Sequence, residues 1–189
     1  MSEERRLADL IIRHCAPTLA NLKTANLFGY RYDTADSLAR ALGELAAELA
    51  PRGIRFRVLH DAGQRALIYV YRARRLAEDL SGAEAAALLA ACGYRCDGCE
   101  AALDCLARRI EADNGQFPHE IGLFLGYPFG DVKGFIENKG RNCKCTGCWK
   151  VYCDECEARR QFGRFEKCRA IYCRLYREGR TLSRLTVAA

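Results

Sequence analysis

The sequence predicts an α+β fold that is mostly helical, with a small antiparallel sheet and a cysteine-rich loop. Apolar residues recur at helical spacing along much of the chain, residues 54–71 carry the pattern of a strand pair, and five cysteines gather within residues 142–156. Half of the 189 residues are apolar, which is enough for one domain with a proper core. Because no repeat or linker divides the chain, we expect a single compact domain over residues 1–189.

The first fifty residues are predicted to form two helices. Ser2 precedes two acids, as at a helix N-terminus, and Pro17 is expected to break this first helix. Residues 18–28 are expected to be short helical or irregular structure. Asp33 or Thr34 is placed to cap the second helix, in which leucines recur on one side.

The predicted sheet consists of a hairpin and the C-terminal tail. Residues 54–60 alternate apolar and basic side chains, and residues 66–71 form a second run rich in β-formers after a glycine-containing turn. We expect these runs to pair as an antiparallel hairpin over 54–71. The tail, residues 181–189, is interpreted as a strand that joins the hairpin.

Helices are expected to fill most of the remaining chain. Ser81 with Glu84 is typical of a capping box, and Asp154 with Glu157 is typical of another, at the start of a long basic helix. Between these caps, apolar spacing and glycine or proline stops predict further helices. They are a helix closed by Gly93, a helix carrying Leu103, Leu106 and Ile110, and short helices over 118–125 and 131–138.

The cysteine-rich loop, residues 142–156, carries the clearest chemical signal. Its spacing is C-x-C-x2-C-x4-C-x2-C, and each C-x2-C pair lets one backbone turn aim two sulfurs at the same point. Two such turns complete a tetrahedron of thiolates, the arrangement of structural zinc sites. We therefore expect a metal site, with zinc favoured, within the loop. The candidate ligands are Cys143, Cys145, Cys148, Cys153 and Cys156.

Two other interpretations of this loop stay open. The spacer of four residues between the pairs is shorter than in the usual zinc ribbon, so an iron–sulfur cluster bound by four of the five thiolates is a rival. Alternatively, the cysteines are unligated structural or redox thiols. A closed zinc site with four thiolates leaves no position for water or substrate, which favours a structural ion over a catalytic one.

A second motif, Cys96-Asp97-Gly98-Cys99, lies at the start of a predicted helix. A helix N-terminus lowers the pKa of a thiol, so Cys96 and Cys99 are candidate redox residues. A helix precedes the motif where a thioredoxin-like protein has a strand, which weakens that comparison. Buried cysteines in a helical hairpin are the alternative interpretation.

Composition favours a cytoplasmic protein. The N-terminus lacks the apolar region of a secretory signal, and no apolar run approaches the ~18 residues of a membrane span, so we expect no membrane partner. In a reducing compartment, the twelve cysteines are more readily ligands, redox centres or buried apolar residues than disulfides.

The positive charge is concentrated around and after the cysteine-rich loop. Residues 133–180 hold thirteen Lys and Arg against six Asp and Glu, whereas residues 1–132 are slightly acidic. Compensation of thiolate charge and an ordinary solvated helix face explain this excess. The alternative is a nucleic acid or another anionic partner that binds the basic 133–180 region.

Several segments together resemble a family of uncharacterised bacterial proteins, found mainly in anaerobes and known only as a domain of unknown function. The segments are His14–Leu19, Lys23–Phe28, His119–Pro128, Asp131–Ile136, Trp149–Tyr152 and Leu185–Ala189. The resemblance spans nearly the whole chain and brings no established activity. It implies a low-oxygen cytoplasm, in which iron–sulfur sites survive, and it draws attention to His14, Cys15 and Lys23 as candidate catalytic residues.

Three functions follow from these observations. The leading hypothesis is a cytoplasmic protein with a structural metal site in the cysteine-rich loop. The second is a thiol-redox or iron–sulfur electron-transfer enzyme that uses the motif at 96–99 or Cys15, so enzymatic activity is left open. The third is a nucleic-acid-binding adaptor that uses the cysteine-rich loop and the basic region.

Overall fold

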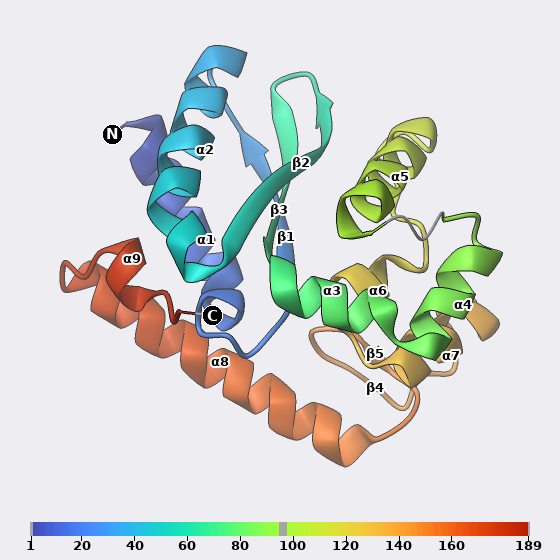
Figure 1. Ribbon diagram of the computed structural model, residues 1–189. Coiled ribbons are helices and arrows are strands. Elements are labelled where there is room, and N and C mark those ends of the chain that lie inside the picture. Colours follow the sequence, from blue (N-terminus) through green and yellow to red (C-terminus); the bar gives the residue numbers. More distant parts are fainter. Residues whose placement is uncertain (1, 95–97, 189) are drawn as a thin grey trace. The chain divides into compact units, whose positions relative to one another are not determined.

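The computed structural model describes residues 2–94 and 98–188, and it has the mostly helical α+β fold that the sequence predicts (Figure 1). The helices are α1 (Glu3–Leu19), α2 (Ala35–Leu49), the 3-10 turn η1 (Ala50–Arg52), α3 (Ala73–Ser81), α4 (Ala83–Ala91), α5 (Cys99–Ala112), α6 (Ile121–Phe124), α7 (Phe129–Glu137), α8 (Glu155–Arg177) and α9 (Leu182–Leu185). The strands are β1 (Ala25–Arg31), β2 (Ile54–Ala62), β3 (Arg65–Arg72), β4 (Cys145–Thr146) and β5 (Lys150–Val151).

The described chain divides into two compact units. Unit 1 combines the residues up to Arg75 with those from Cys168 onward, and unit 2 comprises Leu76–Lys167. Helix α8 begins in unit 2 and ends in unit 1. The expectation of a single domain over 1–189 stays a prediction.

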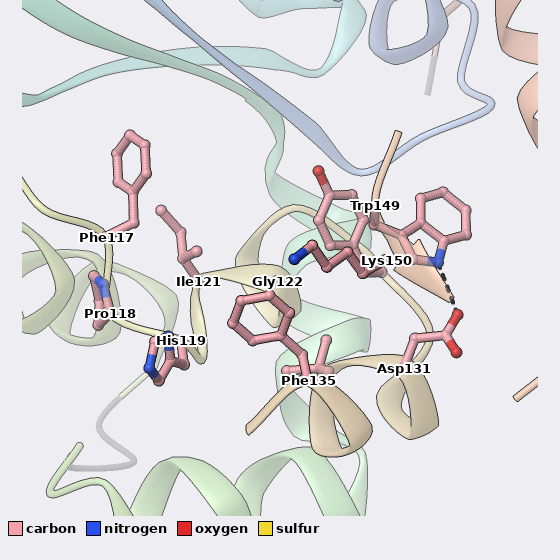
Figure 2. A pocket seen from close by; sticks show the side chains of 11 residues that line it. Phe117, Pro118, His119, Ile121, Gly122, Asp131, Phe135, Trp149 and Lys150 are labelled. Atoms are coloured by element: carbon pink, nitrogen blue, oxygen red, sulfur yellow. Dashed lines mark hydrogen bonds between the residues drawn. The ribbon is translucent and has the colours of Figure 1, made fainter. Parts of the chain in front are cut away.

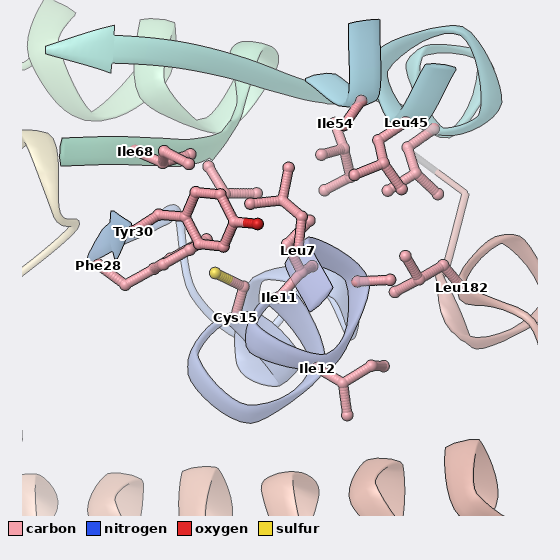
Figure 3. Packing of buried hydrophobic residues seen from close by; sticks show 14 of the residues in the cluster. Leu7, Ile11, Ile12, Cys15, Phe28, Tyr30, Leu45, Ile54, Ile68 and Leu182 are labelled. Atoms are coloured by element: carbon pink, nitrogen blue, oxygen red, sulfur yellow. The ribbon is translucent and has the colours of Figure 1, made fainter. Parts of the chain in front are cut away.

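Unit 1 is built on a three-stranded antiparallel sheet in the order β1-β3-β2. The hairpin predicted over 54–71 is confirmed as β2 and β3. Helices α1 and α2 pack against one face of this sheet, as Figure 3 shows in close-up. Leu7 and Ile11 of α1, Leu45 of α2 and Ile68 of β3 meet there and are fully or almost fully buried, so this face holds the core of unit 1.

The third strand of the sheet is β1. The expectation of helical or irregular structure over 18–28 is wrong from Ala25 onward, because Ala25–Arg31 pairs with β3 along its whole length. Phe28 and Tyr30 alternate with more exposed residues and enter the core, as a half-buried strand requires. Pairing with β3, about forty residues further along the chain, therefore determines that this segment is a strand.

The C-terminal tail is not a strand in the described part of residues 181–189. Thr181 caps α9 instead, since its Oγ1 accepts the backbone N–H of Arg184 at 3.4 Å. Leu182 and Leu185 of this helix are buried in the core of unit 1. A short amphipathic helix therefore buries the apolar residues that the strand interpretation assigned to the sheet.

Pro17 does not break α1, which continues to Leu19. The proline lies in the last turn, where its missing N–H removes only one hydrogen bond before the helix ends. Its carbonyl accepts the N–H of Leu22 at 2.8 Å and that of Lys23 at 3.2 Å. Pro17 thus belongs to the C-terminal closure of α1.

A buried guanidinium closes unit 1. Arg72, at the end of β3, is 2% exposed, and within the described residues its side-chain donors bind backbone carbonyls. The four acceptors are Thr18 at 2.6 Å, Leu19 at 2.7 Å, Val187 at 2.8 Å and Arg52 at 3.3 Å. The first two are carbonyls at the C-terminus of α1, where the helix dipole favours a cation. Arg72 therefore joins α1, η1 and the C-terminal segment.

Unit 2 contains a buried carboxylate among its helices. Glu120, just before α6, accepts the hydroxyl of Tyr94 at 3.0 Å and forms an ion pair with Arg109 of α5 at 3.0 Å. The helices predicted around Leu103–Ile110, 118–125 and 131–138 are confirmed as α5, α6 and α7. The capping box predicted at Ser81 is wrong, because α3 extends through Ser81 and its hydroxyl donates to the carbonyl of Glu78.

Candidate functional site

The cysteine-rich loop folds around a short ribbon, β4–β5, that one buried carboxylate holds in place. Asp131 lies in the first turn of α7 and is 3% exposed. Its Oδ2 accepts the indole N–H of Trp149 at 2.7 Å, and its Oδ1 accepts the backbone N–H groups of Tyr152 and Cys153, each at 2.8 Å. Three donors offset the cost of removing the carboxylate from water. Asp131 therefore fixes the ribbon where it leads into α8.

Two glycines of α7 allow the ribbon to approach this closely. A Cβ at Gly134 would lie 2.6 Å from the side chain of Tyr152, and a Cβ at Gly130 would lie 2.5 Å from Sγ of Cys153. The two glycines are four residues apart, so they lie on the same face of the helix. A larger side chain at either position would separate the ribbon from Asp131.

The first cysteine pair flanks the turn of the ribbon. Cys145 lies opposite Val151 in the antiparallel pairing of β4 with β5. The N–H of Gly147 donates to the carbonyl of Trp149 at 3.0 Å and tightens the turn between Cys145 and Cys148. The ribbon thus folds the first pair back toward the residues that precede α8.

The second cysteine pair lies at the N-terminus of α8. Oδ1 of Asp154 accepts the backbone N–H of Glu157 at 2.9 Å, so the cap predicted from the sequence is confirmed. Cys153 comes just before this cap and Cys156 lies in the first turn of the helix. The second pair thus lies on either side of the Asp154 cap.

One cysteine of each pair lies near the same cation. The pKa of the Arg159 guanidinium is raised, first by its hydrogen bond to Glu155 and further by the charges of Cys145 and Cys156. Arg159 Nη2 lies 2.7 Å from the Glu155 carboxylate. The turn of the ribbon and the start of α8 therefore place Cys145 and Cys156 near the same guanidinium, that of Arg159.

Cys153 is directed to α7 instead. Its Sγ lies against Gly130, and burial raises the pKa of its thiol, as does the neighbouring Asp131 carboxylate. Lys144 acts in the opposite direction and lowers this pKa, and its ammonium donates to the carbonyl of Cys153. The balance favours the neutral thiol at Cys153 in this arrangement.

Cys143, the odd member of the five, lies beside the turn, with its Sγ 3.5 Å from Oγ1 of Thr146. The cysteines of the ribbon are free of disulfide bonds. Within residues 2–94 and 98–188, no three or more His, Cys, Asp or Glu side chains are grouped so that they could hold a metal ion. The metal site predicted from the spacing therefore stays a prediction.

The candidate catalytic residues His14, Cys15 and Lys23 belong to unit 1. Cys15 is fully buried in the core, and burial strongly raises the pKa of its thiol although Lys23 lowers it. The His14 ring stacks on Phe28 with centroids 5.5 Å apart, and burial and the charge of Arg169 lower its pKa. A neutral, inaccessible thiol is a poor nucleophile, so burial argues against catalysis by Cys15.

The candidate redox pair is described at one of its two members, because Cys96 lies outside the described residues. Cys99 is the first residue of α5 and is partly buried. Burial raises the pKa of its thiol, and the charge of Glu100 adds to this. The local surroundings of Cys99 thus oppose the activation that a helix N-terminus supplies, and the redox role stays a prediction.

Ion pairs along α8, one of them with Glu178 just after the helix, take up part of its positive charge. They are Arg159–Glu155 at 2.7 Å, Arg160–Glu157 at 3.0 Å and Arg174–Glu178 at 3.9 Å. Such pairs on a solvated helix face agree with the interpretation of the basic region 133–180 as local compensation. Binding of a nucleic acid or another anionic partner there stays a prediction.

A pocket beside the ribbon was not anticipated from the sequence. It lies within unit 2, has a volume of about 300 Å³ and is bordered by the segment before α6, by α7 and by β5 (Figure 2). Phe117, Ile121, Phe135 and Trp149 supply apolar walls, and Lys150 reaches in from the ribbon. Because these residues are spread over 117–150, no periodicity marks them. Their overlap with the segments that carry the family resemblance is the signal that could have drawn attention to them.

The comparisons with known proteins give one match. The model of a family described as "Protein of unknown function (DUF3793)" matches residues 11–186. No curated protein and no solved structure matches the chain. In the part of the chain that the structure describes, no helix has the length and apolar character needed to cross a membrane.

Proposed function

The chain belongs to DUF3793, a family of proteins of unknown function, and from its own residues we propose that its cysteine ribbon is a structural metal-binding module. The proposed ligands are Cys145, Cys148, Cys153 and Cys156, with zinc as the favoured ion. The observation that carries the proposal is the placement of two C-x2-C pairs at the turn of a hairpin and at the N-terminus of the helix that follows it.

The donors suit a metal of this kind. Cys148, Cys153 and Cys156 are exposed, so they are accessible to an ion from solvent. Soft thiolates select zinc or an iron–sulfur cluster over magnesium or calcium. No three metal-ligating side chains are grouped within the described residues, so the thiols have to approach one another before they bind an ion, and the Cys153 side chain has to rotate away from Gly130. Binding therefore includes a local rearrangement of the ribbon and of the start of α8, and Cys143 is the reserve ligand if Cys153 stays on α7.

Cations near the ribbon are placed to offset the charge of a site with four thiolates. Four thiolates with one Zn²⁺ leave the site at about −2, which nearby cations must offset. Arg159 lies near enough to Cys145 and Cys156 for their charges to raise the pKa of its guanidinium, and the Lys144 ammonium donates to the carbonyl of Cys153. This compensation gives the basic residues near the ribbon a role that needs no anionic partner.

The ion would stabilise the ribbon rather than take part in a reaction. A site closed by four thiolates has no open coordination position, and the ribbon has only two residues in each strand. So short a hairpin is marginal without further support. Asp131 provides that support on the side of α7, and the metal would provide it on the side of the turn.

The test is metal and acid-labile sulfide analysis on protein purified without oxygen. We expect one zinc per chain, no visible absorption band, and a thiolate-to-metal charge-transfer band after replacement of zinc by cobalt. Iron with sulfide and a broad visible band would replace the zinc assignment by an iron–sulfur cluster. Protein without metal that also fails to bind added zinc would refute the proposal.

Single substitutions identify the ligands. We expect Cys148→Ser to lose most of the bound zinc, and Cys173→Ser, at a partly buried cysteine of α8 outside the ribbon, to keep it. Cys153→Ser and Cys143→Ser form the informative pair. Loss of zinc in the first and retention in the second support the proposed set. The reverse result would assign Cys143 as the fourth ligand and leave Cys153 as a packing residue on Gly130.

A further inference from the structure

Aromatic side chains supply a large part of the walls of the pocket beside the ribbon. Phe135 of α7 and Phe117, which is 49% exposed at the rim, contribute rings, and Trp149 and Tyr127 form a stacked pair with centroids 5.1 Å apart. The His119 ring meets Phe135 edge-on at 5.3 Å. Aromatic rings prefer such offset and edge-to-face neighbours, so these walls suit a flat ring system.

The charged groups of the pocket are unequal in what they offer a ligand. Asp131 is part of the lining, but Trp149, Tyr152 and Cys153 already donate to its two oxygens. Lys150 forms no ion pair within the described residues. Its ammonium donates once, to the carbonyl of Gly140 at 2.7 Å, so further N–H donors are available.

Lys150 is also placed where a ligand ring would end. Its Nζ lies 5.8 Å from the centroid of the Phe135 ring, and Figure 2 shows it on the side of the pocket that faces Ile121. A ring packed against Phe135 would therefore bring a substituent at its edge to the ammonium. A negative substituent gains most, because the surrounding apolar walls weaken competition from water.

We propose that this pocket binds a small planar aromatic carboxylate, with its ring between Phe135, Ile121 and Phe117 and its carboxylate on the ammonium of Lys150. A volume of about 300 Å³ is at the lower end for ligand pockets, which fits one or two fused rings. The proposal does not depend on a metal in the ribbon, although Lys150 and Trp149 belong to the ribbon as well as to the pocket.

The protein carries its own probe for this pocket. Trp149 is the single tryptophan of the chain and lies in the pocket wall. Quenching of its emission and calorimetry would follow titration of the full chain, as purified, with 2-naphthoate. The matched control ligand is 2-naphthalenemethanol, which has the same rings and no charge. We expect saturable binding of both, with the acid bound about tenfold more tightly, a difference of about 1.4 kcal/mol.

Variants assign the charge and the ring contacts. We expect Lys150→Met to reduce the affinity for the acid to that for the alcohol and to leave alcohol binding unchanged, which also shows that the pocket persists. Lys150→Arg should keep the preference for the acid. Lys133→Met is the control, because Lys133 is an exposed lysine of α7 outside the lining. Phe117→Ala, at an exposed ring, should weaken both ligands without affecting the fold.

Three results would overturn the proposal. They are equal affinity of the wild type for acid and alcohol, unchanged acid affinity in Lys150→Met, and absence of saturable acid binding to folded protein. If Lys150→Met does not fold, Lys150→Arg and Phe117→Ala decide the question. Loss of the preference for the acid in Lys150→Arg would contradict the proposed placement of the carboxylate. Unchanged affinity for both ligands in Phe117→Ala would contradict the proposed placement of the ring. Zinc content, measured in the same samples, separates failure here from failure of the metal proposal.

Discussion

Each unit contains a buried charge that joins segments far apart in the sequence, but the two charges serve different purposes. Arg72 in unit 1 donates to carbonyls of α1, η1 and the C-terminal segment, all within or beside an apolar core. Asp131 in unit 2 accepts N–H groups from a ribbon whose cysteines reach solvent. Arg72 closes a core, whereas Asp131 positions chemically reactive groups at a surface.

The partners of a buried charge determine which parts of the molecule a substitution at that charge affects. The acceptors of Arg72 are neutral backbone carbonyls, and two of them, those of Thr18 and Leu19, lie at the C-terminus of α1, where the helix dipole favours a cation. The donors to Asp131 belong to Trp149, Tyr152 and Cys153 in the cysteine-rich loop, and Trp149 and Asp131 also line the pocket. A change at Asp131 therefore reaches thiols and pocket together, while a change at Arg72 affects packing.

The largest effect is expected for Arg72→Met. The substitution leaves four buried or partly buried carbonyls without their donor, and we expect the free energy of unfolding to fall by about 3–5 kcal/mol. Chemical denaturation followed by circular dichroism measures this. Arg74→Met, at an exposed arginine two residues away, is the control and should change little. Alkylation of the ribbon cysteines under native conditions should not accelerate, and acceleration would mean that Arg72 also supports the surface site.

Asp131→Asn is expected to be less destabilising and more specific. The amide keeps one acceptor but loses the charge, so we expect a loss of about 1.5–3 kcal/mol. Because the Asp131 carboxylate raises the pKa of Cys153, its removal should lower that pKa and accelerate alkylation of Cys153 near neutral pH. Mass spectrometry of the alkylated protein measures the rate at Cys153, and Trp149 emission during denaturation measures the loss of stability. Asp113→Asn, at an exposed aspartate, is the control. An unchanged alkylation rate in Asp131→Asn would show that the Asp131 carboxylate does not control the reactivity of Cys153.

Alanine substitution at two glycines is expected to change the free energy of unfolding by a smaller amount, with opposite signs at the two positions. A methyl group at Gly147, in the turn of the ribbon, would overlap the Phe162 ring, so Gly147→Ala should cost about 1–2 kcal/mol. Gly163, in α8, has open space around its Cα, so Gly163→Ala should stabilise the helix by about 0.5–1 kcal/mol. Thermal unfolding compares the two variants directly. Equal shifts would show that the close approach at Gly147 does not limit stability.

The fold could be predicted where its cause is local. The β2–β3 hairpin is visible because alternation and a short turn lie within twenty residues, and the cap of α8 is visible at Asp154. Strand β1 was missed because its stability comes from pairing with β3, with Ala25 opposite Tyr71, which local patterns do not encode. The tail was assigned wrongly for a related reason, since packing of Leu182 into the core selects a helix there.

The candidate site shows the same division. The spacing from Cys143 to Cys156 is a local pattern, so the ribbon could be recognised from the sequence alone. Asp131 could not be identified as its anchor, because eighteen residues separate it from Trp149, to which it is hydrogen-bonded. The prominence given to Cys15 rested on the family resemblance, and its complete burial in the core was not visible in the sequence.

The smallest predicted effect tests whether unit 1 contains a charge that depends on pH. Glu3 lies in the first turn of α1 and accepts the hydroxyl of Tyr30 at 2.5 Å, Oγ of Ser37 at 3.0 Å and a guanidinium N–H of Arg6 at 2.8 Å. Burial alone would raise the pKa of Glu3, but these three donors outweigh it and hold the pKa below the ordinary value of 4.5.

A lowered pKa in the folded state means that ionised Glu3 stabilises unit 1 above pH 4.5 and that this contribution is lost as the pH falls through the folded pKa. We therefore expect Glu3→Gln to lower the melting temperature slightly near neutral pH and to flatten its decline in acid. Glu4→Gln, at the exposed neighbour, should preserve the wild-type profile. Parallel profiles of wild type and Glu3→Gln would mean that Tyr30, Ser37 and Arg6 bind the neutral side chain as well as the carboxylate, and unit 1 would then depend on Arg72 as its principal buried charge.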